Sequence, residues 1–476
     1  MNVLLLLVGV AIGAEESQVK VSPELDLWVA QQKISPFSVN AEGLEGGQDS
    51  HVLGRQIVGL AIEGGPVEAR TAVSITEYQL LGSGWDIEGS IDERLRTESA
   101  LTRVTFRELS VSSTLPVAQI QTGLMTSHWG LGMLANDGAH DPYFGLPEFG
   151  DRVIRGRITT QPIPDGSWYL TGAFDRVIQD EQVVDPRRQW AQQGVLSLVW
   201  RQDQNAAGLY GVARRQDELD VRRSTSVGVI DGFVDLTHED DSGLGARFAM
   251  EVAAISGKTN RSTSYGSPER LRIRSLGATG VSMLSWQWLG LGSAFGYASG
   301  DGDPSDDEMN DFTFDRNHGV GMILFDEVSG SIEAATYLNL IDPEHVGSPP
   351  DGVEASVTEG AFRRATYIQP RLELDPLPWV HVRGGLLLAW STAPVRQPFY
   401  TVRNGGVPLN HLQEPTEGYR LGTEMDWAIH VSPLRDKLRS SIGASPSVGV
   451  QWGRAWLAPN LGGESVDRMI VMLRVH

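Results

Sequence analysis

Apolar and polar residues alternate with a period of two along most of the chain after about residue 50. In the run 419–431, apolar and aromatic residues dominate the odd positions, while Arg420, Glu424 and Asp426 occupy even ones. The run 244–254 repeats this pattern. Such a period is that of a β-strand with one apolar and one polar face, so we predict an all-β protein.

About seventeen such runs can be counted from residue 53 to the C-terminus. A barrel whose two ends lie on the same side of a membrane needs an even number of strands. We therefore expect one further strand before residue 53, within 35–45, and about eighteen in total. The predicted fold is an antiparallel up-and-down transmembrane β-barrel.

Two features favour a membrane barrel over a soluble β-sandwich or propeller. The connections alternate between short turns and long loops, the longest being 127–151, 299–360 and 391–417, as periplasmic turns and extracellular loops do. Trp and Tyr residues cluster near strand ends, where an interfacial girdle is expected. A propeller needs a self-similar repeat of about 40 residues, which the sequence lacks.

The N-terminus predicts export. The apolar run 4–10 precedes small residues that end at Ala14, which is typical of a secretory signal peptide and too short to span a bilayer. We divide the chain into a signal peptide (1–14), an N-terminal periplasmic segment with the expected first strand (15–50) and the barrel (51–476). The expected location is the bacterial outer membrane, so outer-membrane lipid and the outer-membrane assembly machinery are expected partners. The chain ends in His476, where such barrels usually end in Phe or Trp.

The net charge and the cysteine content limit the possible partners and the possible disulfides. The chain carries 39 basic and 60 acidic residues, a net charge of −21, which argues against nucleic acid as a partner. It has no cysteine, which fits an exported barrel that needs no disulfides.

If the apolar face meets lipid, the polar face lines the lumen and its charges can be assigned. Arginine rings select anions and hold carboxylates or phosphates, but Arg and Glu on neighbouring strands can also simply brace the wall. Bracing is the expected role of most of these residues, and small anionic or oligosaccharide solutes are the expected cargo. The predicted pore-lining residues are Arg103, Arg107, Arg155, Arg157, Arg247, Arg363, Arg371, Arg383, Arg420, Arg468, Arg474, Glu251, Glu373, Glu424 and Asp426.

Two loops stand out. The segment 127–138, with Trp129, Asn136 and Asp137, is rich in glycine and turn residues. It is expected to enter the barrel mouth as a loop or constriction. A structural role, in which the loop packs inside the barrel, is favoured over direct contact with a substrate. The runs 320–325 and 332–340 are too apolar for an idle surface loop. They are expected to fold inward, extend strands or form a short helix.

The loop after Tyr297 is acidic, and Asp301, Asp303, Asp306 and Asp307 lie close together on a glycine-rich turn. Carboxylates at such spacing suit Ca²⁺, although the EF-hand spacing is absent. A Ca²⁺ site here is one reading, and a solvated acidic loop is the favoured one. No other cofactor is expected.

Several short motifs carry a resemblance. Arg107-Glu108-Leu109, Gln121-Thr122-Gly123, the Trp129-Gly130 loop and the segment 295–303 resemble motifs of alginate-export porins. They also resemble a family of large outer-membrane barrels from myxobacteria and their relatives. The resemblance implies an 18-stranded barrel with an arginine-lined path for an acidic polysaccharide. Thr122 to Met125 stand where that family has a glycine-arginine pair.

The sequence thus predicts a porin or channel for passive passage or export of small or oligomeric solutes, anionic ones included. A non-conducting scaffold or surface-binding barrel is the first alternative, because the loop 299–360 is long enough to bind a partner. An outer-membrane lipid hydrolase is the second. The motifs G-x-S-x-G, H-E-x-x-H and the P-loop are absent, so we do not expect an enzyme. Ser127, His128 and Asp137 are near in sequence, but sequence proximity alone does not make a catalytic triad.

Overall fold

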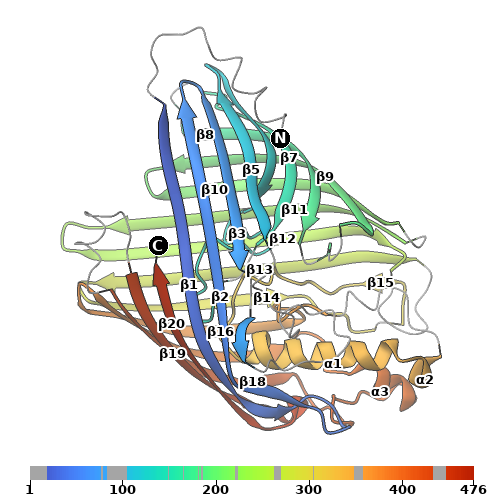
Figure 1. Cartoon of the computed structure of the whole chain (residues 1–476). Helices are drawn as coiled ribbons and strands as arrows, with labels where there is room; N and C mark the ends of the chain where they lie inside the picture. Colours follow the sequence, from blue (N-terminus) through green and yellow to red (C-terminus); the bar gives the residue numbers. More distant parts are fainter. Residues whose placement is uncertain are drawn as a thin grey trace.

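The computed structural model describes residues 19–475 apart from 77–78, 83–103, 148–149, 164–165, 181, 184–185, 220–222, 262–269, 304, 348–356 and 433–445. The expected signal peptide and Arg103 lie outside the described residues. The fold is a closed antiparallel β-barrel of 18 strands, which confirms the predicted class (Figure 1).

Each wall strand pairs in antiparallel fashion with the next wall strand along the chain. The wall consists of β1 (Lys20–Ser38), β2 (Glu45–Gly64), β3 (Val67–Thr76), β5 (Thr105–Thr114), β6 (Ala118–Thr126), β7 (Arg152–Thr160), β8 (Trp168–Gln179), β9 (Gln189–Gln202), β10 (Asn205–Glu218), β11 (Ser224–Glu239), β12 (Leu244–Thr259), β13 (Leu271–Trp286), β14 (Leu289–Ala298), β16 (Ala365–Leu377), β17 (Val380–Ser391), β18 (Arg420–Val431), β19 (Pro446–Leu457) and β20 (Ser465–Val475). Two short strands flank it: β4 (Gln79–Gly82) pairs with β2, and β15 (Glu308–Met309) pairs with β13.

The first and last strands close the barrel. Leu27 to Ile34 of β1 pair with Val475 to Arg468 of β20, so the blue and red strands lie side by side in Figure 1. The first strand therefore lies N-terminal to most of the segment 35–45 in which we expected it. Residues 39–44 instead form the turn between β1 and β2.

The outer face is apolar because the alternation holds in the strands. In β12, Phe248 and Val252 are exposed on one face, while Ala249, Glu251 and Ala253 on the other are fully buried. Exposed aromatic residues lie near both ends of the strands: Trp168, Tyr169, Trp286, Trp288 and Trp379 at the short turns, and Trp190, Tyr297, Trp390, Tyr419 and Trp456 at the long loops. An apolar band between aromatic girdles is the outer surface of an outer-membrane barrel.

Long loops gather at one end of the barrel, and turns as short as two residues join strands at the other. The helices belong to the long loops: a π-helical turn (Leu324–Ser329), α1 (Gly330–Ile341) and α2 (Pro343–Val346) in the loop after β14, and α3 (Pro398–Arg403) in the loop after β17. A 3₁₀ turn (Pro459–Leu461) precedes β20. The three α-helices lie together at one side of the molecule (Figure 1). None of the helices in the described residues is long and apolar enough to cross a membrane.

Candidate functional site

The loop 127–151, here called the crossing loop, spans the lumen between opposite walls. On one side, the Trp129 indole donates to Asp231 of β11 (2.9 Å) and stacks on Tyr210 of β10 with ring centroids 4.7 Å apart. On the other side, Gly145 and Gln451 of β19 exchange two hydrogen bonds of 2.9 Å each. Around the 18-strand wall, β10 and β11 are eight and seven strands away from β19. The loop thus divides the lumen.

The described residues of the loop 299–364, here called the inner loop, form an apolar cluster with the inner faces of β14 and β16–β20. Its backbone N–H groups at Ile323 and Leu324 donate to the Glu424 carboxylate of β18 at 2.9 and 2.7 Å, and that of Met322 donates to the same group. Arg468 of β20 forms an ion pair with Glu327 at 2.8 Å. Of the three alternatives considered for 320–325 and 332–340, the structure combines two: 322–324 contact the inner wall, and α1 is a short helix that covers 332–340.

The inner loop fills its part of the lumen with a large apolar cluster. The largest fully buried side chains that the inner loop contributes to this cluster are Phe312, Phe314, Met322, Ile323, Leu324 and Phe362. The two loops also bind each other, because the Asp315 amide donates to the Met133 carbonyl (2.7 Å) and the Asn136 amide donates to the Asp315 carboxylate (2.9 Å).

His318 of the inner loop connects three elements. One ring nitrogen lies 3.3 Å from the Leu131 carbonyl of the crossing loop, and the other lies 3.1 Å from the Thr279 hydroxyl of β13. Burial lowers the pKa of His318 to about 4. The hydrogen bond to the Leu131 carbonyl acts in the opposite direction, and the positive charge of Arg371 lowers the pKa further. At neutral pH the ring is therefore neutral, which suits its buried position.

A cavity of about 230 Å³ lies on the opposite side, between the two loops and the inner faces of β7–β13. It occupies the loop end of these strands and is lined by aliphatic residues such as Val177 and Val229 together with glutamines. Its arginines are paired with carboxylates: Arg214 with Asp180, Arg261 with Glu218 and Arg363 with Asp311. We call it the vestibule.

Most predicted pore-lining arginines hold the wall or the loops in place. Arg107 donates to the Gly150 carbonyl at 3.0 Å, which fixes one end of the crossing loop. The ion pairs are Arg155–Asp175 (2.7 Å), Arg247–Asp235 (2.8 Å), Arg363–Asp311 (3.1 Å), Arg468–Glu327 (2.8 Å) and Arg474–Asp26 (3.0 Å). Asp26, Asp175, Asp231 and Asp235 were not predicted, so the wall is less positive than the predicted residues implied. Strand alternation applied to β1, β8 and β11 would have found them.

Four predicted arginines, Arg157, Arg371, Arg383 and Arg420, have no carboxylate within ion-pair distance among the described residues; Arg420 is described below. Arg157 bonds to the Gln121 side chain. Arg371 and Arg383 lie against the ring of Tyr143 in the crossing loop, with guanidinium carbons 4.1 and 5.2 Å from the ring centroid. The Arg383 side chain also donates to the Tyr143 carbonyl at 3.3 Å.

The remaining predicted residues are four carboxylates and Arg420. Glu251 accepts from the Leu131 amide of the crossing loop, Glu424 holds the inner loop as described, and Asp426 is fully buried beside it. Glu373 lies near Tyr143, whose pKa is raised, chiefly by burial and then by this carboxylate. Arg420 differs from expectation: it is exposed and bonds to Thr423, because a register shift between Ala389 and Trp390 interrupts the alternation there.

The structure does not assemble the acidic loop into a Ca²⁺ site. The Asp303 side chain accepts from Ser305, Asp306 accepts from the Glu308 amide, and Asp307 forms an ion pair with Arg272 at 3.0 Å. Asp301 accepts from the Asp303 amide. These carboxylates are used in local turns and an ion pair, so the Ca²⁺ reading has no support here, and the solvated acidic loop is retained.

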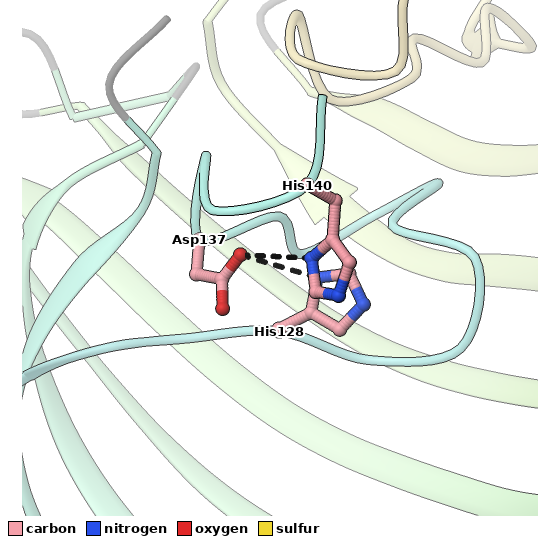
Figure 2. Close-up of side chains that lie close together, drawn as sticks. All are labelled: His128, Asp137 and His140. Carbon is pink, nitrogen blue, oxygen red and sulfur yellow. Dashed lines mark hydrogen bonds and ion pairs between the residues drawn. The ribbon is translucent and has the colours of Figure 1, made fainter. Parts of the chain in front are cut away.

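Asp137 instead lies beside two stacked histidines, as Figure 2 shows. Its Oδ1 is 3.6 Å from His128 Nδ1 and 3.3 Å from His140 Nδ1. The His128 and His140 rings stack with centroids 4.3 Å apart. Ser127 is not part of this group, because its hydroxyl accepts from Arg155 at 3.1 Å. His140 was not singled out from the sequence.

An 18-stranded barrel with an apolar belt, aromatic girdles and long loops folded into its lumen has the architecture of outer-membrane porins, and its location is the bacterial outer membrane. Solved structures of this kind are similar over nearly the whole chain. OccAB1 of Acinetobacter baumannii has a TM-score of 0.54 at 9% identity, covering 97% of this chain and 99% of that chain. OpdK of Pseudomonas aeruginosa has a TM-score of 0.50 at 10% identity, covering 95% and 98%.

A BenF-like porin from Pseudomonas fluorescens Pf-5 has a TM-score of 0.50 at 9% identity and covers 95% of this chain and 98% of that chain. At these identities the likeness concerns the fold. No protein-family model matches the sequence, and no curated protein matches it significantly. The solved neighbours are porins of the Occ and OprD type, and the resemblance to alginate exporters or myxobacterial barrels is not confirmed.

Proposed function

We propose that this protein is an outer-membrane channel that passes small or oligomeric solutes passively, with a preference for anions. The observation that carries the proposal is the placement of Arg371 and Arg383. Both face the lumen in its middle and turn-side part, and neither has a carboxylate within ion-pair distance among the described residues. A guanidinium held there without a paired carboxylate attracts a passing anion and can bind a carboxylate or phosphate in a fork.

Two further features outline a route. The vestibule opens the loop end of the lumen along β7–β13. Near the turn end, Arg247 points inward on β12, and its side chain is 49% exposed, which indicates water inside that end of the barrel. A solute on this route would pass the vestibule, skirt the crossing loop and meet the arginines beside Tyr143. Lipid acyl chains would cover the outer face.

The test is conductance of the refolded protein in a planar bilayer, with the reversal potential measured across a KCl gradient. We expect discrete current steps with anion selectivity, and partial block by small carboxylates or acidic oligosaccharides. Steps with cation selectivity would keep a channel but reject the arginine argument. The absence of steps from a barrel that is folded by circular dichroism would reject the channel itself.

Matched variants sharpen this test. The double variant R371Q/R383Q keeps a polar side chain at both positions while removing two positive charges, and should shift the reversal potential toward zero. R215Q is the control, because Arg215 is 69% exposed and paired with Asp217 at the rim. If both variants shift the reversal potential equally, the selectivity arises from overall charge rather than from the arginines beside Tyr143.

A non-conducting scaffold is the second candidate, and one observation favours it. The crossing and inner loops together occupy much of the lumen with buried contacts, and a barrel closed by its loops would present them as a binding surface instead. A folded barrel without current steps, whose surface loops bind a partner, would support this alternative.

A further inference from the structure

We propose that His128, Asp137 and His140 of the crossing loop form a binding site for one divalent transition-metal ion of the Zn²⁺ class. This site is independent of the proposed channel, because it would exist whether or not the lumen conducts. Two imidazoles and a carboxylate are donors that suit Zn²⁺, Ni²⁺, Co²⁺ or Cu²⁺, whereas Ca²⁺ and Mg²⁺ prefer sets of oxygen ligands.

The geometry fits a single ion. Zn²⁺ binds histidine nitrogen and carboxylate oxygen at about 2.0–2.2 Å in a tetrahedron, so neighbouring donors on one ion lie roughly 3.3–3.6 Å apart. Asp137 Oδ1 lies 3.6 Å from His128 Nδ1 and 3.3 Å from His140 Nδ1. One donor atom from each residue lies within 4.8 Å of the others. Both rings would have to rotate out of their stacked arrangement to turn one nitrogen lone pair each toward the ion.

The two rings also lie on one side of the carboxylate. Figure 2 shows both imidazoles presenting their nitrogens to the same side of Asp137. The rings stack at 4.3 Å with an interplanar angle of 25°. Two protonated imidazoles at that distance would repel each other, whereas two neutral imidazoles can donate their lone pairs to one metal ion beside the carboxylate.

The backbone around the site is fixed by contacts that do not involve the three donors. The Gly138 amide donates to the Asn136 side chain at 3.0 Å, and Arg55 of β2 donates to the Gly138 carbonyl at 3.3 Å. Trp129 is anchored to the wall directly after His128. A loop held in this way positions ligands before the metal arrives, which reduces the entropy that binding must overcome.

The site is also accessible. The side chains of His128 and Asp137 are 25% and 19% exposed, and that of His140 is 66% exposed. An ion can therefore enter from the His140 side, and water can complete its coordination. In the part of the chain that the structure describes, this is the one group of three or more such side chains whose donor atoms meet.

A matched comparison exists elsewhere in the barrel. His381 and Asp375 lie 2.6 Å apart near a short turn, with side chains 29% and 55% exposed. This pair has the same chemistry but offers only two donors. It should bind a transition metal much more weakly, and it serves as an internal control.

The experiment uses the refolded chain in detergent, with any affinity tag removed, titrated with Zn²⁺ by calorimetry and with Co²⁺ by visible absorption. We expect one equivalent of Zn²⁺ per chain and a Co²⁺ spectrum typical of four-coordinate nitrogen and oxygen ligation. H128Q, D137N and H140A should each weaken Zn²⁺ binding at least about tenfold, while H381A should leave it unchanged. Circular dichroism and heat-dependent gel mobility establish that each variant is folded.

Three outcomes would overturn the proposal. One is the absence of stoichiometric Zn²⁺ binding by the folded wild-type chain. Another is wild-type affinity in both H128Q and H140A. A third is an equal loss of affinity in H381A, which would indicate binding by scattered histidines. H140A is the decisive variant, because its exposed side chain can be truncated without leaving a buried cavity.

Discussion

The two sides of the lumen differ in how they are filled. Along β14 and β16–β20 the inner loop packs a large apolar cluster directly on the wall, and Glu424 and Arg468 hold it there. Along β7–β13 the inner faces carry aliphatic residues, glutamines and paired charges, and they surround the vestibule. The same alternating strands build both walls. What separates them is whether a loop supplies apolar partners for the inward side chains.

This difference indicates where a solute can pass. Removing the apolar cluster from contact would expose buried Phe, Met and Leu side chains to water, which is unfavourable at about 25 cal/mol per Å². The inner loop is therefore a permanent part of that side. On the proposed route a solute would therefore enter along β7–β13 at the loop end, where glutamines and charged residues line the cavity, before it reaches Arg371 and Arg383.

The largest expected effect follows from removing the part of the inner loop that packs on the wall. We predict that replacing residues 321–341 with a Gly-Ser linker of equal length raises single-channel conductance several-fold, because a flexible polar linker cannot pack on β16–β20. The measurement is single-channel recording of the refolded variant. Unchanged conductance in a folded barrel would show that the inner loop does not limit the path.

A smaller change should come from Glu424→Gln. The carboxylate accepts three backbone N–H groups of the inner loop, and an amide has one acceptor oxygen and brings its own donors. We expect a loss of about 2–4 kcal/mol in unfolding free energy and a noisier open current. Urea unfolding with tryptophan fluorescence measures the first. E373Q, on β16 two strands away, is the control and should lose less.

The pH dependence should report on His318. Its folded pKa of about 4 lies below the ordinary value, so the unfolded chain takes up the proton more readily. The stability from the neutral buried ring is present above about pH 6.5 and is lost as pH falls toward 4, by about 3 kcal/mol. We predict greater open-channel noise over that range, reduced in H318N. Equal pH profiles for the wild type and H318N would assign the effect to other groups.

The smallest effect is expected at the acidic loop. Asp307 forms an ion pair with Arg272, and both side chains are about half exposed. Such surface pairs contribute about 0–1 kcal/mol. D307N should therefore change unfolding free energy by less than about 0.5 kcal/mol. Millimolar Ca²⁺ should not change the melting temperature of the wild type or of D307N. If Ca²⁺ raised the melting temperature of the wild type but not that of D307N, the acidic loop would be a Ca²⁺ site after all.

Much of the fold could be predicted because alternation is a local property of the chain. β1 was misplaced since its pattern is obscured: Gln31, Gln32 and Lys33 are consecutive polar residues, and Pro23 and Pro36 interrupt the β propensity of the strand. Only its pairing with β2 and β20 shows which of these residues face inward. Register across a closed barrel depends on partners far away in sequence.

The candidate site was predicted less completely, for a different reason. Alternation places Arg155, Arg371 and Arg383 on the inner face, where the structure has them, but their role in a pore stays a prediction. Their partners could not be predicted, since Tyr143 reaches Arg371 and Arg383 only because the crossing loop folds back across the lumen. Loop placement is set by tertiary contacts and has no periodic signal.

The pairing of β1 with β20 has a consequence for biogenesis. Residues near the two ends of the sequence must meet, for example Ile34 with Arg468, so the wall cannot close before the last strand has been synthesised and exported. Until then β1 presents an unpaired edge, which invites pairing with other chains. Such a long-range contact forms slowly. Closure is thus the final step of assembly, and the half-built sheet depends on protection until that step occurs.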